Sequence, residues 1–219
     1  MSRSFASSSV GTKVLIAVTG LLLFLYLVLH LVGNLLVFLG PDVFNGYSHL
    51  LISNPLVIPA EIGLLLIAIV HIWKTARMWL QNRRARPEAY DVKKWAGHTS
   101  RKSVGSTTMI YSGLITAIFV VFHLQQFKYG AYYETAGAAP VRDLYRTEVE
   151  FFQDPLWVGI YVVCMGLIFL HLRHGVSSAF QSLGASENFG KRMLAAGLIV
   201  ALIIGGGFAI IPLFIYFAK

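Results

Sequence analysis

The stretch LIAVTGLLLFLYLVLHLVGNLLVFLG, residues 15–40, decides the fold class of this chain. It carries no charged residue and exceeds the roughly 20 apolar residues that an α-helix needs to cross a bilayer. One ionisable side chain, His30, interrupts it. Because an unpaired imidazole in hydrocarbon is costly, the stretch predicts both a membrane-spanning helix and a partner for His30.

The composition extends this prediction to the whole chain. Of 219 residues, 56% are hydrophobic and 13% are charged, and the mean hydropathy is +0.67. The predicted fold is all-α: a polytopic membrane protein forming a single domain over residues 1–219. Little chain remains for a soluble catalytic domain, so chemistry on a water-soluble substrate would belong to another polypeptide. Five segments have the length and apolarity of spanning helices: residues 14–39, 56–80, 104–127, 156–177 and 193–217.

The single cysteine, Cys164, lies in the middle of a predicted helix. One cysteine excludes an internal disulfide, a thiolate-held iron-sulfur cluster or zinc site, and haem attachment through a CxxCH motif. The first apolar run is longer than the core of a signal peptide and lacks a small-residue cleavage pattern. We therefore expect it to be a retained helix.

Basic residues predict the orientation in the membrane. With the N-terminus on the cytoplasmic side, fourteen of the eighteen lysines and arginines fall on that side. The other four, Lys128, Arg142, Arg146 and Lys219, fall outside, where most acidic residues also lie. This bias follows the positive-inside rule, so the net charge of +8 reflects topology and a docking surface for a cytoplasmic partner, with no need for nucleic acid.

Three loops have distinct compositions. Residues 81–103 are strongly basic and are expected to lie against the membrane or a partner on the cytoplasmic side. Residues 40–59 have Gly and Pro at both ends of a short amphipathic piece. Residues 139–155 place apolar side chains at nearly helical spacing, which predicts an interfacial helix.

The depth of four histidines follows from counting along the helices. His30 comes sixteen residues after Val14, about 24 Å along a helix, which places it near the outer face. His123 reaches a similar depth in the third helix. His71 and His171 lie late in helices that run inward, toward the cytoplasm. Each of the first four helices thus contributes one histidine, two at each of two depths.

Paired imidazoles on facing helices are typical ligands of haem iron. Coordination of one ring nitrogen, with the other donating a hydrogen bond, removes the cost of burying the imidazole. A four-helix bundle core is a known setting for such a site. We therefore expect His30 with His123, and His71 with His171, to ligate two b-type haems. Asn34, one turn from His30, is placed to bond a propionate or a quinone carbonyl.

Other interpretations compete with this one. A lone histidine in a membrane helix is more often a packing or hydrogen-bonding residue, and His174 is an alternative ligand to His171. A zinc or proton-relay cluster would gather its histidines at one depth. His49 and His98 lie in loops. Candidates for inner propionates are Arg101, Lys102, Arg173 and His174, although interfacial cations need no such partner.

At these residues the sequence resembles a known family along nearly its whole length. The stretches that carry the likeness are LHLVGN at residues 29–34, FNGYSHLLISNPLVIPAEIGLLLIAIVHI at 44–72, NRRARPEAY at 82–90, STTMIYSGLITAIFVVFHLQQFK at 106–128 and LHLRHGVSSAFQSLG at 170–184. The chain is similar to the five-helix, diheme cytochrome b558 subunit that anchors succinate dehydrogenase and fumarate reductase. The pattern of His, three residues, then Gly in the fourth helix matches His171 and leaves His174 as an extra histidine.

The resemblance implies a place in respiratory complex II of a bacterial inner membrane. There, a flavoprotein with FAD interconverts succinate and fumarate, a reaction of the tricarboxylic acid cycle. An iron-sulfur subunit on the cytoplasmic face links the flavoprotein to the anchor. Electrons then pass over two haems to a quinone, usually menaquinone, near the outer haem. In the pocket expected there, Asn34, Tyr47, His49 and Glu61 offer hydrogen-bond donors and a carboxylate for the quinone, although Glu61 equally suits a helix N-terminus.

Two other functions remain open at this point. The first is a diheme anchor for a hydrogenase or formate dehydrogenase, whose partner would dock on the outer face. The second is a small transporter without haem that uses histidines and Glu61 for proton coupling. The absorption spectrum of the purified protein separates the haem-binding functions from the transporter.

Overall fold

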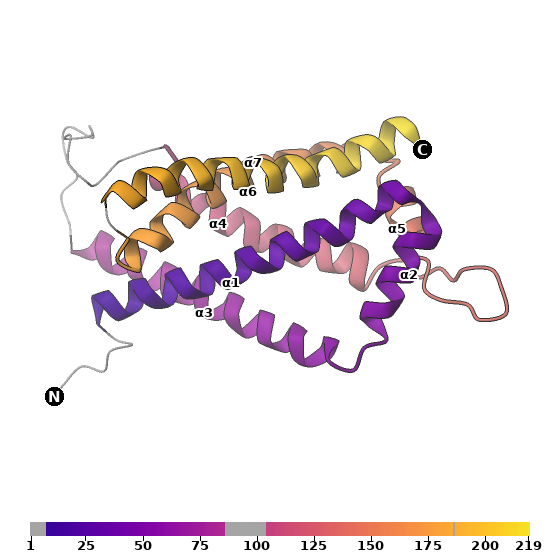
Figure 1. Cartoon of the computed structure of the whole chain (residues 1–219), viewed down its shortest axis with the longest axis horizontal. Coiled ribbons are helices and arrows are strands. Elements are labelled where there is room, and N and C mark those ends of the chain that lie inside the picture. The colour runs from indigo at the N-terminus through magenta and orange to yellow at the C-terminus, as the bar shows by residue number, and fades with distance from the viewer. Residues whose placement is uncertain (1–7, 86–103, 186) are drawn as a thin grey trace.

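A computed structural model describes residues 8–85, 104–185 and 187–219 (Figure 1). The described residues form helices and no strand, which confirms the all-α prediction. The helices are α1 (Ser9–Leu35), η2 (Leu36–Leu39), α2 (Pro41–Ile52), α3 (Val57–Arg84), α4 (Val104–His123), η3 (Leu124–Lys128), α5 (Leu144–Phe151), α6 (Pro155–Ser182) and α7 (Glu187–Ala218).

Five of these helical segments are long and apolar enough to cross a membrane, as the sequence predicts. They span Ser9–Leu39, Val57–Arg84, Thr108–Lys128, Pro155–Ser182 and Ala195–Ala218. Several extend beyond their predicted ends because a helix continues after its apolar run stops. α3, for example, reaches Arg84 with two arginines in its last turn, where the helix dipole favours cations.

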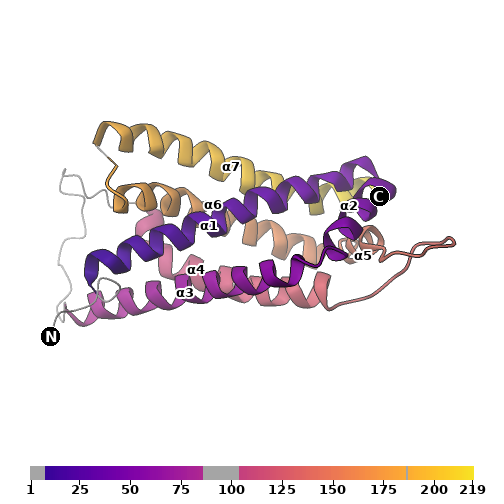
Figure 2. The ribbon, with the colours of Figure 1, turned by 60° about the horizontal axis from the view of Figure 1, so that its bottom comes forward.

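The long helices form one bundle, and α1 begins at the opposite end of it from where α7 ends (Figures 1 and 2). α6 is central: it packs along α7 and also against α1 and α4. The buried apolar core follows α6 and α7, with Met165, Ile168 and Ile204 among its members. α3 packs mainly against α1, contains no buried residue, and meets α4 only slightly. The bundle therefore has a tightly packed side at α6 and α7 and an open side at α3.

Glycines bring α7 close to its neighbours. A Cβ atom added to Gly205 would lie 2.9 Å from the Cβ of Phe169 and 3.3 Å from the carbonyl oxygen of Met165, both on α6. A Cβ at Gly207 would lie 2.9 Å from Leu31 of α1. Small residues at such contacts let membrane helices approach closely. α7 is thus fixed to α6 and α1 by its glycine-rich segment.

Replacement of Gly205 by valine is expected to destabilise the bundle. The added atoms would meet backbone and Cβ atoms of α6, which cannot rotate away, and overpacking of this kind costs about 1–3 kcal/mol. Gly206 is the matched control, because a Cβ there meets nothing within 4 Å. The midpoint of thermal unfolding in detergent should fall for Gly205→Val and stay near the wild-type value for Gly206→Val. Equal midpoints for the two variants would contradict the packing described here.

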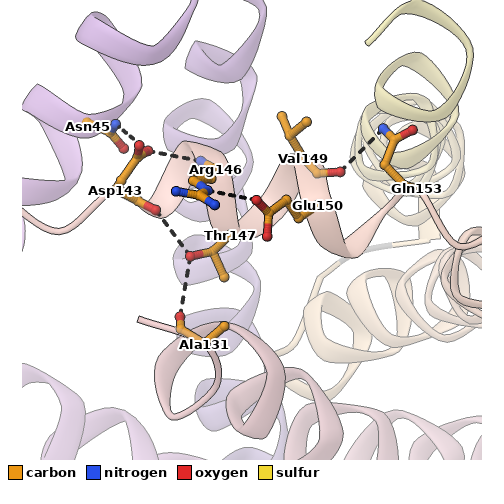
Figure 3. A network of polar contacts seen from close by, with 8 residues as sticks. All are labelled: Asn45, Ala131, Asp143, Arg146, Thr147, Val149, Glu150 and Gln153. Carbon is orange, nitrogen blue, oxygen red and sulfur yellow. Dashed lines mark hydrogen bonds and ion pairs between the residues drawn. The ribbon is translucent and has the colours of Figure 1, made fainter. Parts of the chain in front are cut away.

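α2 and α5 together cover one end of the bundle, which we call the outer end (Figure 1). The Asn45 amide donates to Asp143 at 2.8 Å, and its oxygen accepts from the backbone N–H of Tyr145 at 2.9 Å. Asp143 also accepts from the N–H of Arg146 and so caps α5 (Figure 3). A helix within residues 139–155, predicted from the sequence, is confirmed.

Gly40 allows the chain to turn from the first membrane segment into α2. Its φ is +97°, in a region that side-chain-bearing residues rarely adopt, and Pro41 follows at the first position of α2. Gly40 and Pro41, which mark the start of this loop in the sequence, therefore form the predicted turn. α2 occupies most of the stretch between them and α3.

Candidate functional site: histidines of four helices

His30 of α1 and His123 of α4 lie next to each other toward the outer end. Their ring centroids are 5.8 Å apart, and the ring planes are nearly perpendicular, at 89°. Both side chains are half-buried. Two imidazoles bound to one metal, each through a bond of about 2 Å, would have ring centres roughly 6 Å apart. The spacing of the outer pair is therefore close to that of two axial ligands.

The hydrogen bonds of His123 leave one of its ring nitrogens able to bind a metal ion. Nδ1 lies 3.3 Å from the hydroxyl of Tyr161, and that hydroxyl donates its own hydrogen to the side-chain oxygen of Gln126. The Tyr161 oxygen can then only accept from Nδ1–H. This assigns the tautomer with the lone pair on Nε2, the arrangement that metal-bound histidines usually show.

His71 of α3 makes a similar contact with α1. Its Nδ1 lies 3.1 Å from Thr19 Oγ1, while that hydroxyl lies 2.6 Å from the carbonyl oxygen of Leu15 and donates to it. The threonine therefore accepts from Nδ1–H, and Nε2 keeps its lone pair. Gly20 lies against the same ring, because a Cβ there would be 3.0 Å from Cε1 of His71.

His171 of α6 repeats this arrangement against α4. Its Nδ1 lies 3.1 Å from Ser112 Oγ, which donates to the carbonyl oxygen of Met109 at 3.2 Å. A Cβ at Gly113 would lie 3.2 Å from Cε1 of His171. Both Thr19 and Ser112 are buried. A buried hydroxyl followed by glycine thus faces the imidazole on each of the two helix pairs.

The two arrangements are also matched along the sequence. Thr19 and Ser112 each come eleven residues before an outer histidine on the same helix, His30 and His123 respectively. His71 and His171 lie close enough to interact electrostatically. α1 with α3 and α4 with α6 are therefore equivalent helix pairs, and each contributes one histidine to each level of the bundle.

The side chains proposed from the sequence for a quinone lie in different settings. Asn34 donates to the backbone carbonyl of His30 at 2.8 Å, and its amide lies beside the His30 ring. Tyr47 lies on Gly33, where a Cβ would be 2.7 Å from its ring. His49 is exposed on α2. Glu61 forms an ion pair with Lys128 of η3.

Tyr26 is a neighbour of the outer pair that the sequence reasoning missed. Its ring stacks on His30, with centroids 5.4 Å apart and planes at 15°. It also interacts electrostatically with Glu61 and is 40% exposed. Tyr26 lies four residues before His30, so the shared helix face was a usable signal. The structure thus joins His30, Tyr26, Glu61 and Lys128 in one group of side chains.

Two of the four candidates for inner propionates can be placed. Arg173 is exposed on α6. His174 is half-buried and interacts electrostatically with His171. Arg101 and Lys102 lie outside the described residues.

The described part of the chain contains no group of three or more His, Cys, Asp or Glu side chains that could hold a metal ion. Within it, the rings of His30 and His123 instead lie side by side as a pair. Comparisons with protein-family models, with curated proteins and with solved structures found no match. The described residues therefore form a helical protein with five candidate membrane spans and a pair of adjacent histidines, His30 and His123, toward the outer end.

Proposed function

We propose that this chain is the membrane-anchoring, diheme cytochrome b subunit of a succinate:quinone oxidoreductase. His30 and His123 would ligate an outer haem b, and His71 and His171 an inner one. The observation that carries the proposal is a hydroxyl oxygen beside Nδ1 at three of these histidines, at 3.1–3.3 Å. With Nδ1–H donating to that oxygen, Nε2 would be available for iron.

The bound haems would supply the one-electron chemistry, while the chain's own residues hold and insulate them. Thr19, Ser112 and Tyr161 fix the ring orientation of three ligands. Gly20 and Gly113 keep the space beside the inner rings free of side chains. Phe208 of α7 lies 5.5 Å from His30, between ring centroids, and helps to exclude water from the outer pair.

The path of electron transfer follows from the proposed topology. The positive-inside bias would place the inner pair next to the cytoplasm, where an iron-sulfur subunit docks and carries electrons from a FAD-containing flavoprotein. The outer pair would exchange electrons with a quinone, menaquinone being the species that the resemblance implies. Charge moved across the bilayer in this way couples to the membrane potential, at about 2.3 kcal/mol per charge per 100 mV.

The quinone site is proposed beside the outer pair. Tyr26 stacks on His30 and offers a hydroxyl, and Glu61 with Lys128 offers a carboxylate and a cation next to it. The amide of Asn34 lies beside the His30 ring, and Tyr47 lies on Gly33. The exposed His49 is the weakest member of the set.

The test is a reduced-minus-oxidised absorption spectrum of the purified protein, with a count of haem per chain. We expect the spectrum of low-spin b-type haem and two haems per chain. A protein without haem would overturn the proposal and favour the transporter. Copurification with succinate dehydrogenase subunits, as opposed to hydrogenase or formate dehydrogenase subunits, tests the identity of the partner.

The hydroxyls that face the inner histidines give a further prediction. Thr19→Val and Ser112→Ala each remove the acceptor for an Nδ1–H while keeping a side chain of similar size. Loss of such a partner typically weakens metal binding about 10–100-fold, so the inner haem should be lost first during dilution or competition with apomyoglobin. Thr116→Val is the control, because the Thr116 hydroxyl donates to the backbone carbonyl of Ser112, one turn away on the same helix, and not to a histidine of the described residues. Unchanged retention in all three variants would count against the proposed role.

A further inference from the structure

The helix that carries His123 changes its hydrogen-bond pattern directly after that residue. α4 ends at His123, and η3 follows as a π-turn in which the backbone N–H of Tyr129 donates to the carbonyl of Leu124 at 3.0 Å. A π-turn is wider than an α-helical turn, so it rotates the side chains that follow His123, and such turns are rare and frequent at functional sites. Gln126 of η3 reaches α6, where its side-chain oxygen accepts from the hydroxyl of Tyr161.

The backbone of η3 is held in place by residues outside the helix. Arg142, which precedes α5, donates to the carbonyl oxygen of Phe127 at 2.7 Å and to that of Lys128 at 3.3 Å. Carbonyls at the end of a helix lack partners within it, and the guanidinium supplies two such partners. A Cβ at Gly130 would collide with the carbonyl oxygen of Gln126. The position of Gln126 relative to α6 is therefore fixed by backbone contacts as well as by its own hydrogen bond.

The direction of the Tyr161 hydrogen bond decides which nitrogen of His123 has the lone pair. The hydroxyl has one hydrogen, and as long as Gln126 accepts it, the Tyr161 oxygen accepts from Nδ1–H of His123. Without that acceptor, the same hydrogen is free to point to Nδ1, and the imidazole hydrogen would then lie on Nε2. Tyr161 is only 6% exposed, and the rings packed around it, such as Phe119 and Phe152, offer no strong acceptor in place of Gln126.

The hydroxyls beside the inner histidines are oriented by backbone groups instead. Thr19 donates to the carbonyl of Leu15, and Ser112 to that of Met109, each on its own helix. A backbone carbonyl is present whatever side chain the residue carries. At the outer pair the acceptor is a side chain from another element, so the identity of the residue at position 126 controls the tautomer of His123.

We propose that Gln126 is a positioning residue for the outer histidine pair. By accepting the Tyr161 hydrogen, it keeps the hydrogen of His123 on Nδ1 and the lone pair on Nε2. The binding of haem iron at that lone pair rests on the proposed function, whereas the tautomer does not. Because hydrogen bonds in a chain polarise one another, Gln126 also makes Tyr161 a better acceptor and the His123 ring a stronger electron donor.

The test compares the wild type with Gln126→Leu, which keeps a side chain of similar size and removes the acceptor. Gln125→Leu is the control, because Gln125 is exposed on the same π-turn. Loss of an outer-shell partner weakens metal binding about 10–100-fold. We expect the lower end, a loss of about tenfold for oxidised iron, which corresponds to a rise of about 59 mV in the midpoint potential of the outer haem. The inner-haem potential, and both potentials in Gln125→Leu, should stay at their wild-type values.

A double-mutant cycle with Tyr161→Phe separates positioning from a general packing defect. If Gln126 acts through the Tyr161 hydroxyl, adding Gln126→Leu to Tyr161→Phe should leave the outer-haem potential where Tyr161→Phe alone puts it. Additive shifts in the double variant, or an unchanged potential in Gln126→Leu, would overturn the proposal.

The tautomer of His123 also has a readout that needs no haem. In nitrogen NMR spectra of the full chain, isotope-labelled at histidine and prepared without haem, a nitrogen that carries hydrogen is distinct from one with a free lone pair. His123→Ala identifies the signals of His123. We expect the hydrogen on Nδ1 in the wild type and Gln125→Leu, and on Nε2 in Gln126→Leu. Hydrogen on Nδ1 in both the wild type and Gln126→Leu overturns the proposal, whereas a purified wild type that binds no haem overturns only the proposed function.

Discussion

Replacing His30 or His123 by alanine is expected to remove the same single haem and leave the other in place. The two rings face one another at 5.8 Å and would share one iron, so either change deletes one of its two axial ligands. The inner histidines lie on two other helices, α3 and α6, and have their own hydroxyl partners. Haem content should therefore fall from two per chain to one, with the same spectral component missing in both variants.

The complementary variants make this prediction sharper. His71→Ala and His171→Ala should both remove the second component and retain the first. His49→Ala is the control, since that side chain is exposed on α2 and should leave both haems in place. Loss of both components from each single variant would contradict the pairing, as would a shared phenotype for His30→Ala and His71→Ala.

Replacing Gly20 or Gly113 by leucine is expected to remove the inner haem. A Cβ at these positions would already lie 3.0 or 3.2 Å from the imidazole carbons of His71 and His171. The remaining atoms of leucine would displace rings that a haem needs within a bond length of iron. The outer haem should remain, because both glycines lie ten residues from the outer histidines on their helices.

Gly63 of α3 provides the matched control for the glycine variants. It lies in a helix of the same bundle, and a Cβ there meets nothing within 4 Å. Gly63→Leu should retain both haems in the spectrum of the purified protein. Retention of the inner haem in Gly20→Leu and Gly113→Leu would show that the two glycines do not limit the space beside the rings.

Much of the fold could be predicted because membrane helices leave a simple signal. Each spanning segment is a long apolar run, and the five runs appear as five helices. The helix ends were less predictable, since α3 continues to Arg84 and α6 to Ser182 in polar sequence. The length and hydropathy of a segment indicate which residues lie in the hydrocarbon. The end of a helix depends instead on where its last backbone carbonyls find other hydrogen-bond partners.

The histidines could be singled out from the sequence, but their neighbours could not. Thr19 and Ser112 look like ordinary small residues of apolar helices, and their contact with His71 and His171 depends on how the helices are rotated and paired. The same holds for Tyr161 beside His123. Glu148 appeared only as an outer acidic residue, because the burial of this α5 side chain depends on the tertiary structure. The ligand roles themselves stay predictions until haem is measured.

α3 has no buried residue and packs mainly against α1, and this loose packing bears on how the subunit would be assembled in the cell. His71 makes the contact of α3 with Thr19 and Gly20 of α1. A prosthetic group bound by both His71 and His171 would therefore also link α3 to α6. Cofactor binding and completion of the fold would then be a single thermodynamic event. A subunit left unloaded would present a loosely held helix to membrane proteases, so cofactor supply would set how much of the subunit the cell retains.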